Sequence, residues 1–138
     1  MVTILWCYSR NNEFLKDNVD YNSAADIAGQ ANYLGVSLQV DIIKQKSPTS
    51  KVGFTAIGFA ETDPLTYTKL SSDDTIDLCR CQVLNCYVGR LAMLNTGGES
   101  KGESNFKQAR KTAVVNKRTG GSGIIMRHKL LSVLLTIE

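Results

Sequence analysis

Leu-Gln-Val-Asp-Ile-Ile, residues 38–43, is the stretch on which the fold prediction rests. Its apolar residues Leu38, Val40 and Ile42 recur at every second position, which is the pattern of a half-buried strand. A polar, basic run then interrupts the pattern before a second apolar segment begins at Val52. Two apolar arms around a polar turn predict a β-hairpin over residues 36–60 with a basic tip.

Strand-like segments also lie at both ends of the chain. Val2 to Tyr8 is rich in β-branched and aromatic residues and predicts an N-terminal strand. Residues 111–117 and 124–137 read as two further strands, joined by a glycine-rich turn whose residues accept the positive φ angles of tight hairpins. The sequence therefore predicts a second hairpin at the C-terminus.

Two segments have the apolar spacing of helices. Between Ser23 and Leu34, alanines and Ile27 recur at intervals of three and four residues. The segment 72–94 shows the same spacing, and it opens with Ser72 and two aspartates that suit a helix N-terminus. Together with the hairpins, these helices predict an α+β fold: an antiparallel β-sheet with two helices packed on one face, as a single domain over residues 1–138.

The composition agrees with one globular domain. The chain has 138 residues, of which 43% are hydrophobic and 21% are charged, and these fractions are typical of folded proteins. The apolar runs are shorter than the roughly 18 residues that a membrane span needs, and the N-terminus lacks the features of a signal peptide. We therefore predict an intracellular protein, or one within an assembled particle, that does not span a membrane.

Charge is distributed unevenly along the chain. Residues 1–100 carry a net charge of −3, whereas residues 101–138 carry +6 and contain no aspartate. Such asymmetry favours an anionic partner. The ten basic residues predicted to contact a nucleic-acid backbone are Lys44, Lys46, Lys51, Lys107, Arg110, Lys111, Lys117, Arg118, Arg127 and Lys129.

The four cysteines do not have the spacing of a disulfide scaffold, so we interpret them as reduced thiols. Cys79 and Cys81 would point about 200° apart on a helix, which argues against a shared metal ion. A strand at this position would place both on one face and reopen the zinc interpretation. The sequence predicts neither a metal nor a cofactor.

Catalytic motifs are weak in this sequence. Gly98 to Gly102 matches the letters of a nucleophile elbow, but no apolar strand precedes it. His128 is the sole histidine and is flanked by two cations, which favours contact with an anion over general base catalysis. A dispersed enzyme site would have to be assembled from Asp26, Asp41, Asp77 and His128.

These observations favour a non-enzymatic, self-assembling structural protein, such as a viral coat protein, that contacts nucleic acid through its basic C-terminal hairpin. The tail 130–137 has apolar residues at both odd and even positions, so both faces of a strand there would be apolar. We expect another copy of the chain to cover one face, which predicts a homo-oligomer formed through the C-terminal strand. Two alternatives remain open: a small nucleic-acid-binding regulatory module, and a small enzyme with a dispersed site.

Overall fold

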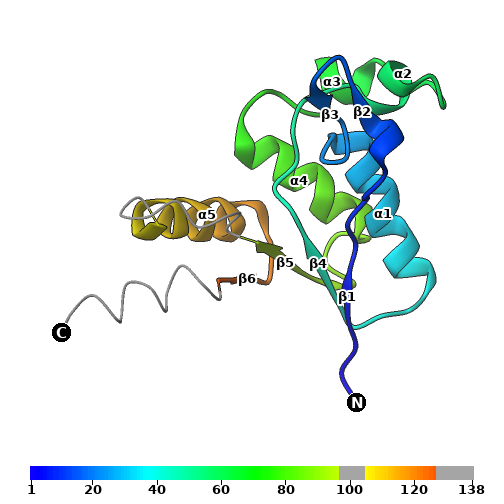
Figure 1. Cartoon of the computed structure of the whole chain (residues 1–138). Coiled ribbons are helices and arrows are strands. Elements are labelled where there is room, and N and C mark those ends of the chain that lie inside the picture. The colour runs from blue at the N-terminus through cyan, green and yellow to red at the C-terminus, as the bar shows by residue number, and fades with distance from the viewer. Residues whose placement is uncertain (97–104, 127–138) are drawn as a thin grey trace.

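The protein is built on a sheet of four parallel strands. The computed structural model describes residues 1–96 and 105–126 (Figure 1). The strands are β1 (Ile4–Trp6), β4 (Ile42–Gln45), β5 (Ala92–Thr96) and β6 (Gly123–Ile125), and they lie side by side in this order. Every neighbouring pair is parallel. Parallel strands cannot be joined by a tight turn, so a crossover connects each strand to the next.

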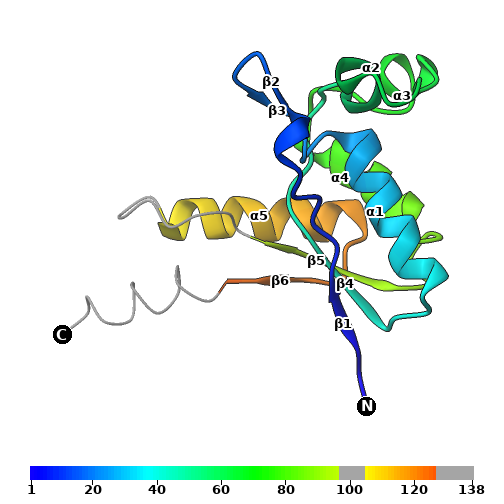
Figure 2. The same cartoon turned by 45° about the vertical axis from the view of Figure 1, so that its right-hand side comes forward.

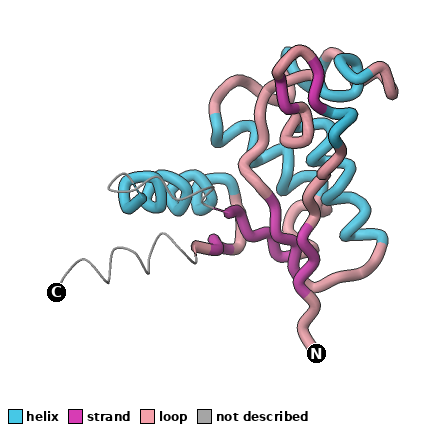
Figure 3. Tube along the Cα trace, viewed as in Figure 1, coloured by secondary structure: helices cyan, strands magenta, loops and turns pink. Residues whose placement is uncertain are grey.

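The crossovers carry the main helices. Helix α1 (Ala25–Ser37) joins β1 to β4, α4 (Thr75–Asn85) joins β4 to β5, and α5 (Asn105–Thr119) joins β5 to β6. Figures 1 and 2 show α1 and α4 side by side against the sheet, with α5 alongside β5 and β6. Helix therefore alternates with strand along the chain, as the coloured tube of Figure 3 makes visible.

Two crossovers contain smaller elements. Between β1 and α1 lie a 3-10 helix, η1 (Asn12–Phe14), and a short antiparallel pair, β2 (Leu15–Lys16) and β3 (Val19–Asp20). Between β4 and α4 lie the short helices α2 (Gly53–Ile57) and α3 (Leu65–Thr68). These insertions follow the carboxyl ends of β1 and β4, which is where the loops of parallel α/β proteins form binding sites.

The hydrophobic core lies between the helices and one face of the sheet. Its buried members are Cys7, Val40, Ile43, Val83, Cys86, Leu91 and Met93. Gly35 lets α1 approach β4 closely, because a Cβ at this position would lie 2.7 Å from Cδ1 of Ile43. All four cysteines are buried free thiols, which confirms the sequence-based interpretation.

The prediction of an antiparallel α+β sheet was wrong. The N-terminal strand and the helix near residues 23–34 are confirmed as β1 and α1. The hairpin over residues 36–60 does not form, because β4 pairs with β1 and β5 and residues 53–57 are helical. An alternating pattern reports a strand but does not distinguish parallel from antiparallel pairing.

The second half of the chain also differs from the prediction. The helix predicted over residues 72–94 ends at Asn85, because Tyr87, Val88 and Gly89 all have positive φ angles of 50° to 87°. The predicted strand 111–117 belongs to α5, so it cannot form the predicted hairpin with residues 124–137. Strand β6 pairs with β5 instead, and this pair is parallel. The rest of the predicted strand 124–137, from residue 127 onward, lies outside the described residues.

Within the described residues, no helix has both the length and the apolar character needed to cross a membrane.

Candidate active site

One face of the sheet carries a row of side chains that points away from the helices. Parallel register pairs Trp6 with Lys44 and Lys44 with Leu94, so these three residues share a face. Their neighbours Ile43 and Met93 point to the opposite, helix-covered face and are buried. Parallel sheets are normally covered on both faces, yet the side chain of Trp6 is 62% exposed.

Lys44 is the distinctive residue of this face. Its Nζ lies 3.5 Å from the centroid of the Trp6 ring and 5.8 Å from that of Tyr8. The residue is only 9% exposed, and no carboxylate of the described chain forms an ion pair with it. Burial lowers the pKa of Lys44 from the ordinary value of 10.5, because desolvation disfavours the ammonium form.

Hydroxyl and cationic groups surround this lysine at the carboxyl edge of the sheet. The rings of Trp6 and Tyr8 lie 6.0 Å apart, and Nζ of Lys46 lies 5.6 Å from the Tyr8 ring. Burial raises the pKa of Tyr8, while a side-chain hydrogen bond with Thr96 and the charge of Arg10 oppose the rise. The edge therefore combines an amine, a phenol, an alcohol and positive charge.

This arrangement suits chemistry at a carbonyl group. A lysine becomes nucleophilic when desolvation favours its neutral amine, and such an amine adds to ketones and aldehydes to form imines. Active sites of parallel α/β proteins lie at the carboxyl ends of the strands, and Lys44 is close to the end of β4. Fold and site together define a parallel α/β protein with a candidate amine nucleophile at the carboxyl edge of its sheet.

The chain belongs to the DeoC/LacD family of aldolases, whose family model matches residues 1–131. It is 53% identical over 129 residues to a probable class 1 fructose-bisphosphate aldolase of Chlamydia muridarum. It is 54% identical over 129 residues to the corresponding protein of Chlamydia trachomatis serovar D. Both alignments cover 94% of this chain but only 37% of the relative, so the chain spans little more than a third of their length.

Solved structures show the same fold. A Schiff-base-forming fructose-1,6-bisphosphate aldolase superposes with a TM-score of 0.55 at 16% identity, over 90% of this chain and 36% of the other. An archaeal fructose-1,6-bisphosphate aldolase, whose catalytic Lys is bound to the carbinolamine intermediate of its substrate, gives 0.56 at 16% identity with the same coverage. The fold is accordingly the parallel, TIM-barrel-like α/β fold of aldolases.

These findings correct the functional prediction made from the sequence. A family of aldolases is a family of enzymes, so the expectation of a non-enzymatic, self-assembling coat protein was wrong. The predicted nucleic-acid partner is likewise wrong, because the relatives are aldolases of a sugar phosphate. The predicted homo-oligomer contact through the C-terminal strand falls mostly on residues 127–137, which lie outside the described residues. The alternative of a small enzyme fits the findings better.

Eight of the ten predicted basic residues lie in the described part of the chain, on β4, in the segment that follows it and on α5. Lys44 lies beneath Trp6, and Lys46 lies beside Tyr8. Lys51 lies 5.9 Å from the Tyr21 ring. Helix α5 carries Lys107, Arg110, Lys111, Lys117 and Arg118, and all of these except Lys117 line a groove of about 630 Å³. Arg127 and Lys129 lie outside the described residues.

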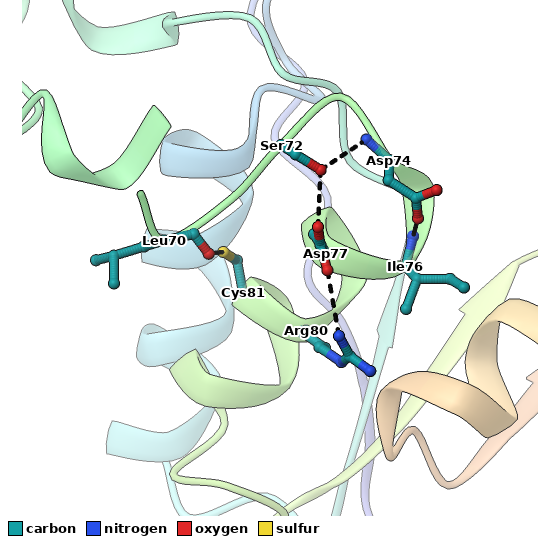
Figure 4. Close-up of polar contacts among 7 residues, drawn as sticks. All are labelled: Leu70, Ser72, Asp74, Ile76, Asp77, Arg80 and Cys81. Carbon is teal, nitrogen blue, oxygen red and sulfur yellow. Dashed lines mark hydrogen bonds and ion pairs between the residues drawn. The ribbon is translucent and has the colours of Figure 1, made fainter. Parts of the chain in front are cut away.

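The aspartates considered for a dispersed site accept hydrogen bonds from neighbouring parts of the chain. Asp77 accepts a hydrogen bond from Oγ of Ser72 at 2.7 Å and pairs with Arg80 at 3.2 Å, both near the start of α4 (Figure 4). Oδ2 of Asp41 accepts from the Thr3 amide at 2.8 Å. His128 and the Gly98 to Gly102 motif lie outside the described residues. In the described part, no cluster of His, Cys, Asp or Glu could hold a metal ion.

Asp26 holds the insertion that follows β4. Its carboxylate accepts from the amides of Gly53 at 3.2 Å and Phe54 at 3.0 Å, and from Oγ1 of Thr62 at 2.8 Å. Gly53 and Phe54 form the first turn of α2, which lacks a side-chain cap of its own. Asp26 therefore caps α2 from the N-terminus of α1.

Replacing Asp26 with alanine is expected to loosen the α2–α3 segment. A lost cap costs about 1 kcal/mol, so limited proteolysis should cleave residues 52–70 several times faster than in the wild type. Asp77→Ala is the control, because it removes an exposed ion pair elsewhere. Equal cleavage of both variants would contradict the capping role.

Sequence reasoning included Lys44 among the residues predicted to contact nucleic acid but did not single out Trp6 and Tyr8. The predicted strand ended at Ile43, so Lys44 was assigned to a basic turn. One local signal points the other way: Lys44 follows Ile42 and Ile43 directly and so could extend their strand. Trp6 and Tyr8 were placed in a strand, but nothing in the local pattern brings residue 6 next to residue 44.

Proposed function

We propose that this chain supplies the imine-forming lysine of a class 1 fructose-bisphosphate aldolase, and that this lysine is Lys44. The observation that carries the proposal is the environment of Lys44: the residue is 9% exposed, it has no carboxylate partner in the described chain, and its Nζ lies over the ring of Trp6. The similarity to aldolases that form a Schiff base on a lysine supports the same assignment.

The chemistry follows from the neutral amine. Nζ adds to the ketone carbon of the sugar, and loss of water from the resulting carbinolamine gives a protonated imine. The bond that then breaks joins the carbon next to the imine carbon to the hydroxyl-bearing carbon that follows it. The hydroxyl loses its proton and its carbon leaves as an aldehyde, which is the first product. The electrons of the broken bond pass to the iminium, which becomes an enamine. Protonation of the enamine and hydrolysis of the imine release the second product and regenerate the amine.

The charge of the carboxyl edge suits a phosphorylated sugar. Lys46 and Arg10 are exposed and flank Tyr8. Their positive charges favour the approach of a bisphosphate over that of a neutral sugar. The anionic partner inferred from the basic residues is, in this proposal, a small phosphorylated substrate.

We also propose an intracellular location. Four buried free thiols are typical of proteins kept in a reducing compartment, and this supports the proposal.

Borohydride trapping tests the assignment of Lys44. Incubating the chain with fructose 1,6-bisphosphate and sodium borohydride should reduce the imine to a stable secondary amine, and peptide mass spectrometry should locate the adduct on Lys44. Omitting the sugar provides the blank. An adduct spread evenly over exposed lysines such as Lys46 and Lys69 would contradict the proposal, as would the absence of any adduct.

A further inference from the structure

Five buried carboxamides form a hydrogen-bonded network behind the lysine site, in two groups that are joined through the backbone of Lys46. Their residues are between 0% and 3% exposed: Asn32, Gln45, Gln82, Asn95 and Asn116. Burying an amide is unfavourable unless its polar atoms are paired. In the described chain no buried side-chain nitrogen or oxygen lacks a partner, so the five carboxamides form a fully satisfied network.

The carboxamide network begins at the two strands that carry the site. Nε2 of Gln45 donates to the carbonyl of Cys7, the residue after β1, at 2.6 Å and to Oδ1 of Asn32 on α1 at 3.0 Å. Its Oε1 accepts from the amide of Lys46 at 2.8 Å. The side chain of Gln45 therefore ties the end of β1 to the end of β4 and to α1.

The network continues through α4 and β5 to α5. Nε2 of Gln82 donates to the carbonyl of Lys46 at 2.8 Å, and Oε1 of Gln82 accepts from Asn95 at 3.0 Å. Oδ1 of Asn95 in turn accepts from Asn116 at 2.8 Å. Both backbone polar groups of Lys46 are thus held by carboxamides, one from the end of β4 and one from α4.

The network meets the candidate site in the same way on three neighbouring strands. On each of three adjacent strands, one residue bonded into the network lies between two residues of the open face. These triplets are Trp6, Cys7 and Tyr8 on and after β1; Lys44, Gln45 and Lys46 on and after β4; and Leu94, Asn95 and Thr96 on β5. Because alternate residues point to opposite faces, fixing the middle residue fixes the directions of both neighbours.

We propose that this carboxamide network is a positioning device, which holds Lys44, Tyr8 and Thr96 in one arrangement by locking the strand positions between them. The proposal rests on the aldolase function of the lysine site. Hydrogen bonds are directional, whereas an apolar core of similar volume would be about as stable without fixing the strand ends so closely. Gln82 is the central positioning residue, because within the described chain it bonds to the backbone of Lys46 and to the side chain of Asn95 but not to Lys44, Tyr8 or Thr96.

Gln82→Met tests the positioning role, since methionine keeps the volume and removes both hydrogen bonds. Val83→Ala is the matched control, because Val83 is the next residue of α4, is also buried and has an apolar side chain. Two readouts are measured in the full chain. One is the pH dependence of reductive methylation of Lys44 by formaldehyde and cyanoborohydride, and the other is borohydride trapping with fructose 1,6-bisphosphate.

In the wild type, we expect the methylation midpoint of Lys44 to lie below 10.5, in line with its burial. Gln82→Met should shift this midpoint toward 10.5 and slow trapping about tenfold, because a small displacement of a reacting group is costly. Val83→Ala should change neither readout, although it lowers stability. Equal changes in both variants, or no change in Gln82→Met, would overturn the proposal.

The two proposals can fail separately. If the wild type gives no sugar adduct, the aldolase function fails, whereas the methylation midpoint still reports whether the network positions Lys44. If Gln82→Met does not fold, Asn116→Ala replaces it, because Asn116 is bonded to Gln82 only through Asn95 and lies outside β4. The same upward shift of the Lys44 midpoint is expected, and its absence would count against the proposal.

Discussion

Replacing Lys44 with methionine should abolish the borohydride-trapped adduct while leaving the fold intact. Methionine preserves the unbranched stem that packs beneath Trp6 but has no nitrogen to form an imine. The variant loses a cation–π contact worth about 0.5–1 kcal/mol. Methionine carries no charge, so the variant is also free of the unfavourable desolvation of an ammonium group. The two effects oppose each other, and the free energy of unfolding should not fall.

The stability of the two proteins should also depend differently on pH. The pKa of Lys44 is lower in the folded chain than the unfolded value of 10.5. Between these two values the unfolded chain binds more protons, so the stability of the wild type rises with pH across this window. Lys44→Met lacks this contribution. Urea unfolding of both proteins from pH 8 to 10 measures the difference, and parallel pH profiles would contradict the desolvation of Lys44.

Replacing Ile43 with alanine should have the largest effect on stability. Ile43 is fully buried on the central strand β4 and packs directly against Gly35 of α1. Truncating such a side chain removes its burial and leaves a cavity, which costs about 3 kcal/mol. The measurement is the midpoint of urea unfolding with an unchanged denaturant slope.

Ile4→Ala is the matched control for Ile43→Ala. Ile4 belongs to the same sheet but lies on the open face and is 47% exposed. Its loss should lower the free energy of unfolding by less than about 1 kcal/mol. Comparable losses in the two variants would show that the helix-covered face is not the main core.

Local patterns predicted the individual elements better than their pairing. The strand signals at Val2–Tyr8 and near Ile42 were placed correctly to within a few residues, and so was helix α1. Whether strands pair as parallel or antiparallel depends on contacts far apart in the sequence, which alternation does not report. Helix α5 was misread because Thr112, Val114 and Val115 have β-branched side chains, and tertiary packing overrides that preference.

The candidate site was less accessible to sequence reasoning than the fold. Lys44 was singled out for its charge, whereas the proposed role rests on its burial, and that burial depends on the registers of β1 and β4. The pairing of Trp6 with Lys44 joins residues separated by 38 positions. The carboxamides of the buried network are scattered over the chain, so no motif marked them.

The order of the strands also determines when the site can first exist during synthesis. Ribosomes release the chain from its N-terminus, and Trp6 and Tyr8 emerge long before Lys44 and Thr96. A parallel pair can close only after its crossover has been made, so β1 cannot pair with β4 until α1 and β4 have been translated. The surroundings of Lys44 are therefore complete only once β1, β4 and β5 have been translated and aligned, and a nascent chain that ends before β5 lacks part of the candidate site.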